Sequence, residues 1–206
     1  MLKVGLTGGY ATGKSFVAQE LERLGCHIIY ADRLGHEVLL PDGEAYIPVV
    51  AEFGRQILDD DGRIDRKKLA GLVFDDAGRL KTLTGFVHPA VFRLEQSLLD
   101  NFAALDPLGI SVIEAAILIE ANRTDFFDKI ILTVCDPEVQ IARAMRRDNA
   151  TREQVAARVS NQMPEEEKRK HANFIVDTSG TKQQTSAQVE AMHTELLKLA
   201  DSRGED

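Results

Sequence analysis

The chain has 206 residues, of which 44% are hydrophobic and 28% charged, and its formal net charge is −8. This acidic balance argues against a general nucleic-acid or anionic-membrane surface, because binding to phosphate backbones relies on a basic face. No stretch approaches the roughly 18 apolar residues of a membrane helix, and the N-terminus lacks a charged segment followed by an apolar one. We therefore expect a cytoplasmic chain with no nucleic-acid or membrane partner, and we infer no obligate protein partner.

A strand, a glycine loop and a helix are predicted in this order at the start of the chain. Residues 2–7 form a short apolar run typical of a buried parallel strand, and apolar residues repeat at helical spacing from Val17 to Leu24. Between them, residues 8–15 read GGYATGKS and satisfy the pattern G-x-x-x-x-G-K-[ST]. Such a loop aims backbone N–H groups and the positive end of a helix dipole at one point, which predicts a phosphate-binding loop.

The loop indicates ATP and Mg²⁺ as the cofactors. Lys14 would reach the β- and γ-phosphates, and the Ser15 hydroxyl would ligate Mg²⁺. The residues of the loop expected to bind the nucleotide are Gly8, Gly9, Ala11, Thr12, Gly13, Lys14, Ser15 and Phe16.

A second apolar strand, Cys26–Tyr30, is followed at once by Asp32. In an open parallel sheet the functional crevice lies at the carboxyl ends of the strands, so Asp32 is expected to face the same crevice as the phosphate loop. A carboxylate there can accept the proton of an attacking hydroxyl, which makes Asp32 a catalytic candidate beside Lys14. An apolar helical pattern follows Asp32, so a compatible structural reading is a helix N-cap.

A long and mostly helical stretch comes next, with a helix opening near Asp65 and another running from about Ala77 past Pro89 to about Leu105. It is too long for a simple crossover between strands, so we interpret residues 34–104 as a substrate-binding insertion.

Three more apolar strands are predicted: Ile110–Ile113, Lys129–Cys135 and Phe174–Val176. Strands that alternate with helices favour an α/β fold in which a five-stranded parallel sheet is flanked by helices. The two cysteines, Cys26 and Cys135, have no metal-binding spacing and are expected to be buried free thiols in a reducing compartment.

Arginines gather after the fourth strand. Arg143 and Arg147 are four residues apart and share a helix face, and Arg158 belongs to the next helix, which opens with a capping box at Thr151–Gln154. Guanidinium groups can hold the negative charge that spreads over a transferring phosphoryl group, whereas solvated surface arginines are the alternative. With the charged segment 163–170, which we expect to be mobile, these helices are interpreted as a lid.

The predicted organisation is a single chain with a core at about residues 1–33, 105–142 and 172–206, the insertion at about 34–104 and the lid at about 143–171.

Two other functions fit parts of the pattern. Residues 32–35 and 122–125 mimic the D-x-x-G and N-[KR]-x-D elements of a GTPase switch protein, but between Ser15 and Asp32 there is no room for a switch loop. Another small-molecule kinase, such as a nucleoside monophosphate kinase, would need clustered arginines for its phosphate acceptor. The arginines of the insertion are instead scattered along it, at Arg55, Arg63, Arg66, Arg79 and Arg93.

Over most of its length the sequence resembles the dephospho-coenzyme A kinase family. The resemblance rests on the phosphate loop, on IIYADRLG with Asp32 at the family's catalytic aspartate, and on EAAILIE at residues 114–120. More specific are the matches to the family string FG..IL..DG.LDR..L...VF and to its HP element. These matches comprise Phe53-Gly54, Ile57-Leu58, Asp61-Gly62, Ile64–Arg66, Leu69, Val73-Phe74 and His88-Pro89, and the lid matches comprise Gln140, Arg143, Arg147, Arg158, Gln162-Met163 and Ser179-Gly180.

The resemblance implies that ATP phosphorylates the ribose 3′-hydroxyl of dephospho-coenzyme A, the small-molecule substrate, to give coenzyme A and ADP. Asp32 would take or orient the hydroxyl proton and Arg143 would close over the transferring group. The further residues implied are His88 and Arg158 for the substrate and Arg147 and Gly180 for the nucleotide. His88 could equally be a helix-packing residue.

Several positions depart from the family pattern. Tyr30 replaces an aspartate, Glu114 replaces an aspartate with a longer side chain, Phe16 replaces a hydroxyl residue, and Thr178 stands where asparagine is usual. Ala11 replaces a glycine of the phosphate loop, so we expect its φ to stay below zero.

Overall fold

The computed structural model describes residues 1–202. The chain forms two compact units, one comprising Met1–Tyr30 and the chain from Asn101 onward, the other Ala31–Asp100. The first contains all five strands and the second is helical.

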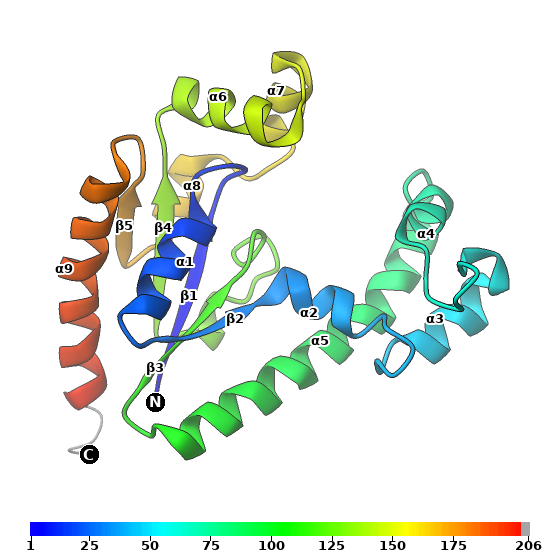
Figure 1. Ribbon diagram of the computed structural model, residues 1–206, viewed down its shortest axis with the longest axis horizontal. Helices are drawn as coiled ribbons and strands as arrows, with labels where there is room; N and C mark the ends of the chain where they lie inside the picture. Colours follow the sequence, from blue (N-terminus) through cyan, green and yellow to red (C-terminus); the bar gives the residue numbers. More distant parts are fainter. Residues whose placement is uncertain (203–206) are drawn as a thin grey trace. The chain divides into compact units, whose positions relative to one another are not determined.

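The strands of the first unit form one parallel sheet in the order β2-β3-β1-β4-β5, which confirms the predicted fold class (Figure 1). Their bounds are β1 Leu2–Gly8, β2 His27–Tyr30, β3 Ile110–Glu114, β4 Lys129–Val134 and β5 Phe174–Asp177. Because β1 is central, the loop that follows it is flanked by the ends of β3 and β4. Leu6 pairs with Glu114 and Gly8 with Thr133, so polar residues of both neighbours end beside that loop.

The sheet is held by an apolar core between the strands and two helices, α1 (Lys14–Arg23) and α9 (Lys182–Asp201), which contact each other (Figure 1). Both helices turn an apolar stripe inward, with Leu21 of α1 and Leu196 of α9 fully buried. Burial of such side chains stabilises the fold by roughly 1.5–3 kcal/mol each. The start of α1 is therefore fixed by packing as well as by its loop.

Three short helices follow β4: α6 (Pro137–Asp148), α7 (Arg152–Ser160) and α8 (Glu165–Arg169). The carboxylate of Asp136 caps α6 by accepting from two backbone N–H groups, and the predicted capping box of Thr151 and Gln154 opens α7. The short 3₁₀ segment η2 (Thr124–Phe126) precedes β4.

The second unit contains α2 (Ala31–Glu37), α3 (Tyr46–Phe53), the 3₁₀ segment η1 (Arg55–Ile57), α4 (Arg66–Val73) and most of α5 (Ala77–Leu105). Two predictions are confirmed here. Asp65 caps α4 by accepting from the N–H groups of Lys67 and Lys68, and α5 continues through Pro89.

Cys26 and Cys135 are buried free thiols, as predicted. Burial raises the pKa of the Cys26 thiol to about 12, so this group stays protonated and unreactive. Over residues 1–202, no helix is long and apolar enough to cross a membrane.

Candidate active site

The loop between β1 and α1 makes two demands on its glycines. At Gly8, a Cβ would lie 2.1 Å from the Thr133 hydroxyl oxygen and 2.6 Å from the Thr133 carbonyl oxygen, so a side chain there would clash with β4. Gly13, the N-cap of α1, has φ 86°, a left-handed conformation that glycine adopts without strain. The first turn of α1 therefore begins with uncapped N–H groups, which form an anion-binding end.

The prediction for Ala11 is wrong, because its φ is +58°. The loop has to reverse within a few residues, and that path places the fourth loop residue in the left-handed region whether or not it carries a Cβ. An L-residue pays roughly 1–2 kcal/mol for this conformation. Ala11 is thus a strained residue inside the phosphate loop.

The Lys14 ammonium is folded over the loop. Its Nζ donates to the carbonyl oxygens of Gly8 and Gly9, both at 2.9 Å. These contacts hold the positive charge beside the N-terminal end of α1, where the helix dipole already favours an anion. The contact of Lys14 with the β- and γ-phosphates stays a prediction.

Hydroxyl groups connect the loop to β4 and to the residue that directly follows β5. The hydroxyl oxygens of Thr12 and Thr133 are 2.8 Å apart, and the Thr178 hydroxyl lies 2.9 Å from the Thr12 carbonyl oxygen. Arg143 donates to the Thr178 hydroxyl at 3.0 Å and to the Thr178 carbonyl oxygen at 2.7 Å. Arg143 thus supports the loop through Thr178. Sequence reasoning missed Thr133 and treated Thr178 only as a departure.

Arg147 and Arg158 meet over the side chain of Tyr10, at the tip of the loop. The guanidinium groups of Arg147 and Arg158 lie 4.9 and 5.6 Å from the centroid of the Tyr10 ring. Asp148 accepts hydrogen bonds from Arg147 at 2.8 Å, from Arg158 at 3.3 Å and from the Tyr10 hydroxyl. The structure therefore separates Arg143 from Arg147 although both lie on α6, and it adds Tyr10 and Asp148, which the sequence did not single out.

Two glutamines hydrogen-bond to the backbone of the same tyrosine, one from α6 and one from the chain between α7 and α8. Gln140 on α6 donates to the Tyr10 carbonyl oxygen at 2.7 Å, and the Tyr10 N–H donates to the Gln162 side-chain oxygen at 2.7 Å. Both glutamines belong to the lid pattern of the family resemblance. Their contacts give that pattern a physical meaning, because they set the position of the loop tip.

Ser15 and Glu114 are the oxygen groups of this edge that fit a divalent cation. The Ser15 hydroxyl donates to the Glu114 carboxylate at 3.5 Å, and Glu114, at the end of β3, is 9% exposed. Hydroxyl and carboxylate oxygens are hard ligands of the kind that Mg²⁺ prefers. The longer glutamate, noted as a departure, does reach the loop.

Phe16 and Gly180 both lie near the start of α9. Phe16 is half-buried, and the ammonium group of Lys182 is 5.3 Å from its ring centroid. Gly180 is exposed and directly precedes Thr181, the N-cap of α9. Their nucleotide contacts stay predictions.

Asp32 and His88 belong to the second unit. Asp32 is exposed and is the second residue of α2, so it lies in the first turn and is not the N-cap that the sequence allowed. His88 is exposed on α5, where its ring centroid lies 6.1 Å from that of Phe92 on the same helix, so it does not pack into the core. Their catalytic and acceptor roles stay predictions.

A buried ion pair lies beside the loop and was not foreseen. The Nζ of Lys168, on α8, is 2.7 Å from a carboxylate oxygen of Glu120, and the two side chains are 2% and 23% exposed. Lys168 also lines a cavity of about 90 Å³ together with Gly9 and Gln162. The segment 163–170 therefore has one firm attachment to the chain after β3, whereas its mobility stays a prediction.

Known proteins resemble this chain in sequence and in fold. A family model described as dephospho-CoA kinase matches residues 2–184. A relative from Geobacter metallireducens, named dephospho-CoA kinase, is 40% identical over 96% of this chain and 98% of its own length.

Two solved structures are similar throughout. The structure of TT1252 from Thermus thermophilus has a TM-score of 0.80 and 32% identity, covering 95% of this chain and 97% of its own. A dephospho-CoA kinase from Campylobacter jejuni has a TM-score of 0.64 and 25% identity, covering 94% of this chain and 96% of its own.

Proposed function

The chain belongs to the dephospho-CoA kinase family, and we propose that it transfers the γ-phosphoryl group of ATP to the ribose 3′-hydroxyl of dephospho-coenzyme A. The products are coenzyme A and ADP. The main support for this proposal is that the family match includes the phosphate loop. At this loop, Lys14 contacts the Gly8 carbonyl oxygen and Arg147 lies over the ring of Tyr10. The match also spans Asp32, the candidate base.

The residues of the first unit hold the donor. The N–H groups at the start of α1 receive phosphate oxygens, and Lys14 exchanges its contacts with two loop carbonyls for the β- and γ-phosphates. Arg147 and Arg158 supply guanidinium groups for the charge of the transferring group, and Arg143 is proposed to act with them from its place beside Thr178. Gly180 and Phe16 are proposed to contact the nucleotide beyond the phosphates.

Asp32 acts as the general base that accepts the proton of the 3′-hydroxyl group. The 3′-oxygen forms a bond to the γ-phosphorus while the bond from that phosphorus to the β–γ bridging oxygen breaks, and ADP leaves with the bridging oxygen. The hydroxyl proton passes to the Asp32 carboxylate and then to water. His88 is proposed to contact the acceptor. Because Asp32 is exposed, substrate binding has to exclude water from it for the transfer to outcompete hydrolysis.

Mg²⁺ is proposed at Ser15 and Glu114, whose oxygens fit it. When bound, the ion supplies neutralisation of the β- and γ-phosphate oxygens.

The free, buried thiols of Cys26 and Cys135 support a cytoplasmic location, since reducing compartments keep thiols unpaired. We propose dephospho-coenzyme A as the acceptor, with no obligate protein partner.

The test is ADP release from Mg·ATP with dephospho-coenzyme A, adenosine, CMP, UMP or no acceptor. We expect release to depend on dephospho-coenzyme A, with coenzyme A formed in equal amount. Turnover only with CMP or UMP would keep the phosphate-loop chemistry and overturn the proposed acceptor.

A further inference from the structure

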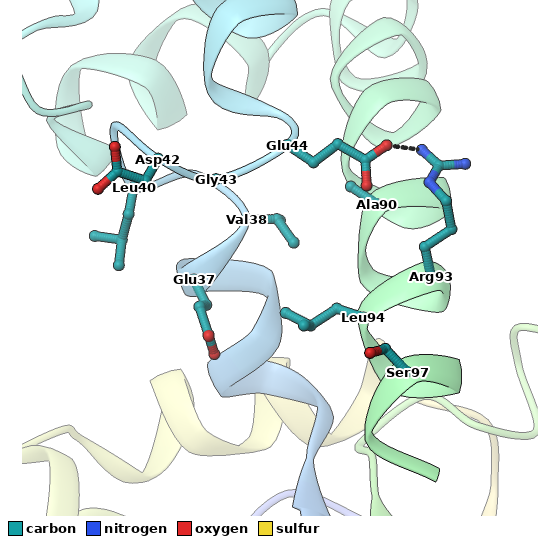
Figure 2. A pocket seen from close by; sticks show the side chains of 10 residues that line it. All are labelled: Glu37, Val38, Leu40, Asp42, Gly43, Glu44, Ala90, Arg93, Leu94 and Ser97. Atoms are coloured by element: carbon teal, nitrogen blue, oxygen red, sulfur yellow. Dashed lines mark ion pairs between the residues drawn. The ribbon is translucent and has the colours of Figure 1, made fainter. Parts of the chain in front are cut away.

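The second unit has a pocket of about 460 Å³, between the chain that follows α2 and one face of α5 (Figure 2). Val38 and Leu94 point toward each other from its two walls, and Ala90 adds to the apolar surface on the α5 side. The volume is within the usual range for small-molecule sites, about 300–1,000 Å³.

Polar groups of mainly one sign surround this apolar surface. Glu37, Asp42 and Glu44 line the pocket, and Arg93 is the single cationic lining residue. Arg93 forms an ion pair with Glu44, drawn in Figure 2, and this contact lowers the pKa of Glu44. The Arg93 charge is therefore already matched, and Glu37 and Asp42 leave the lining with an excess of negative charge.

We propose that this pocket binds the pantetheine arm of the acceptor, an inference that rests on the proposed function. Dephospho-coenzyme A has three parts: an adenosine, a pyrophosphate and the pantetheine arm. The pyrophosphate, esterified at both ends, is a dianion and is repelled by an acidic lining. The arm is uncharged, its methyl and methylene groups match Val38 and Leu94, and its two amide N–H groups are donors for carboxylate oxygens.

The position of the pocket along the chain suits this occupant. Glu37, which lines the pocket, is on the same helix as Asp32 and five residues further on. At 1.5 Å per residue, the two Cα atoms are separated by about 7.5 Å along the helix axis. In the acceptor, the ribose that carries the 3′-hydroxyl is separated from the arm by the pyrophosphate. Helix α2 would thus run beside that linker, with the proposed base at one end and the pocket at the other.

The experiment narrows the pocket without touching the proposed catalytic groups. Ser97 lines the pocket and is exposed, so Ser97→Trp places an indole in it at little cost to folding. Gln96→Trp is the matched control, because Gln96 is the exposed neighbour on α5 and does not line the pocket. We expect Ser97→Trp to raise the KM for dephospho-coenzyme A at least about tenfold, equivalent to losing about two buried methylenes. The KM for ATP should stay within about twofold.

Pantetheine itself is the second probe. In the parent it should inhibit competitively against dephospho-coenzyme A and not against ATP, and Ser97→Trp should weaken that inhibition by a similar factor. If Ser97→Trp does not fold, Leu94→Ala replaces it, with Leu80→Ala on the same helix as its control; Leu94 lines the pocket and Leu80 does not. The Leu94 change should raise the acceptor KM about fivefold more than the Leu80 change.

The outcomes separate two failures. If the parent turns over dephospho-coenzyme A but the pocket variants match their controls, the pocket assignment is wrong and the proposed function stands. If the parent does not use dephospho-coenzyme A, both are overturned.

Discussion

The phosphate loop and the pocket beside α5 are built by different means. At the loop, backbone groups, Lys14 and threonine hydroxyls are held by hydrogen bonds of 2.8–3.0 Å to several strands and helices. At the pocket, the charged groups that interact are Glu44 and Arg93, whose side chains are 53% and 61% exposed. An ion pair that exposed contributes about 0–1 kcal/mol.

This difference indicates that the side chains of the loop are already held in place before substrate binds, whereas those of the pocket are less constrained. The loop is organised in the protein alone, so changes there should alter stability or donor binding. The pocket has few fixed polar contacts, so changes there should act on acceptor binding. The following predictions probe this contrast, from the largest effect to the smallest.

Asp32→Asn separates donor binding from chemistry. Loss of a general base should lower kcat by about 10²–10⁴, while the Kd for ATP stays within about twofold because the proposed donor contacts belong to the first unit. Steady-state rates and ATP titration measure the two quantities. Asp75→Asn, at an exposed position of the second unit, is the control and should leave kcat unchanged. A rate for Asp32→Asn within about threefold of the parent would remove the base assignment.

Lys168→Met tests the buried pair of the first unit. Removing the ammonium leaves the Glu120 charge without its partner, so we expect a loss of about 3 kcal/mol in the free energy of unfolding, measured in urea.

Two variants control for the size of that effect. Lys170 is the C-cap of α8 and forms an exposed pair with Glu167, so Lys170→Met should cost less than about 0.5 kcal/mol. The double change Lys168→Met with Glu120→Leu should recover most of the loss. If Lys168→Met and Lys170→Met lowered the free energy of unfolding equally, burial of the Lys168–Glu120 pair would not contribute to stability.

Ala11→Gly should relieve strain in the loop. The left-handed conformation costs alanine roughly 1–2 kcal/mol, and the extra freedom of glycine in the unfolded chain cancels part of the gain, so the net stabilisation should be about 0.5–1 kcal/mol. Ala51→Gly, at an exposed position inside α3, should instead destabilise by about 1 kcal/mol. Destabilisation by both would contradict the strain at Ala11.

The smallest expected effect is on the pH dependence of stability. Burial lowers the pKa of His193, on α9, below the ordinary value of 6.5. Well above pH 6.5, His193 is neutral in both the folded and the unfolded chain and does not affect the pH dependence of stability. As the pH falls below 6.5, His193 is protonated first in the unfolded chain, so the free energy of unfolding decreases until the pH passes the folded pKa. His193→Gln should flatten this decline in urea titrations from pH 8 to 5.

His36 provides the comparison within the second unit. The pKa of His36 is also lowered, first by partial burial and then by the positive charge of Arg66. His36 is nevertheless an exposed residue of α2. Solvent weakens the effect there, so His36→Gln should change the decline less than His193→Gln does. If His36→Gln changed the pH dependence of stability more than His193→Gln, His193 would not be the main source of the decline.

Local rules were sufficient where backbone geometry decides the outcome. The phosphate loop, the five parallel strands, the capping box at Thr151 and the continuous α5 all followed from short patterns of residue type and spacing. The same rules failed at Ala11, because the path of the loop overrides the preference of a single residue.

The sequence by itself determined that this chain has a phosphate loop on a parallel sheet, together with the family resemblance that the matches bear out. Only the tertiary structure decided which arginines meet Tyr10, that Lys168 is buried, and that Val38 and Leu94 face one pocket. Those contacts join residues far apart in the chain. Their side-chain directions depend on how helices pack, and no spacing rule along one segment contains that information.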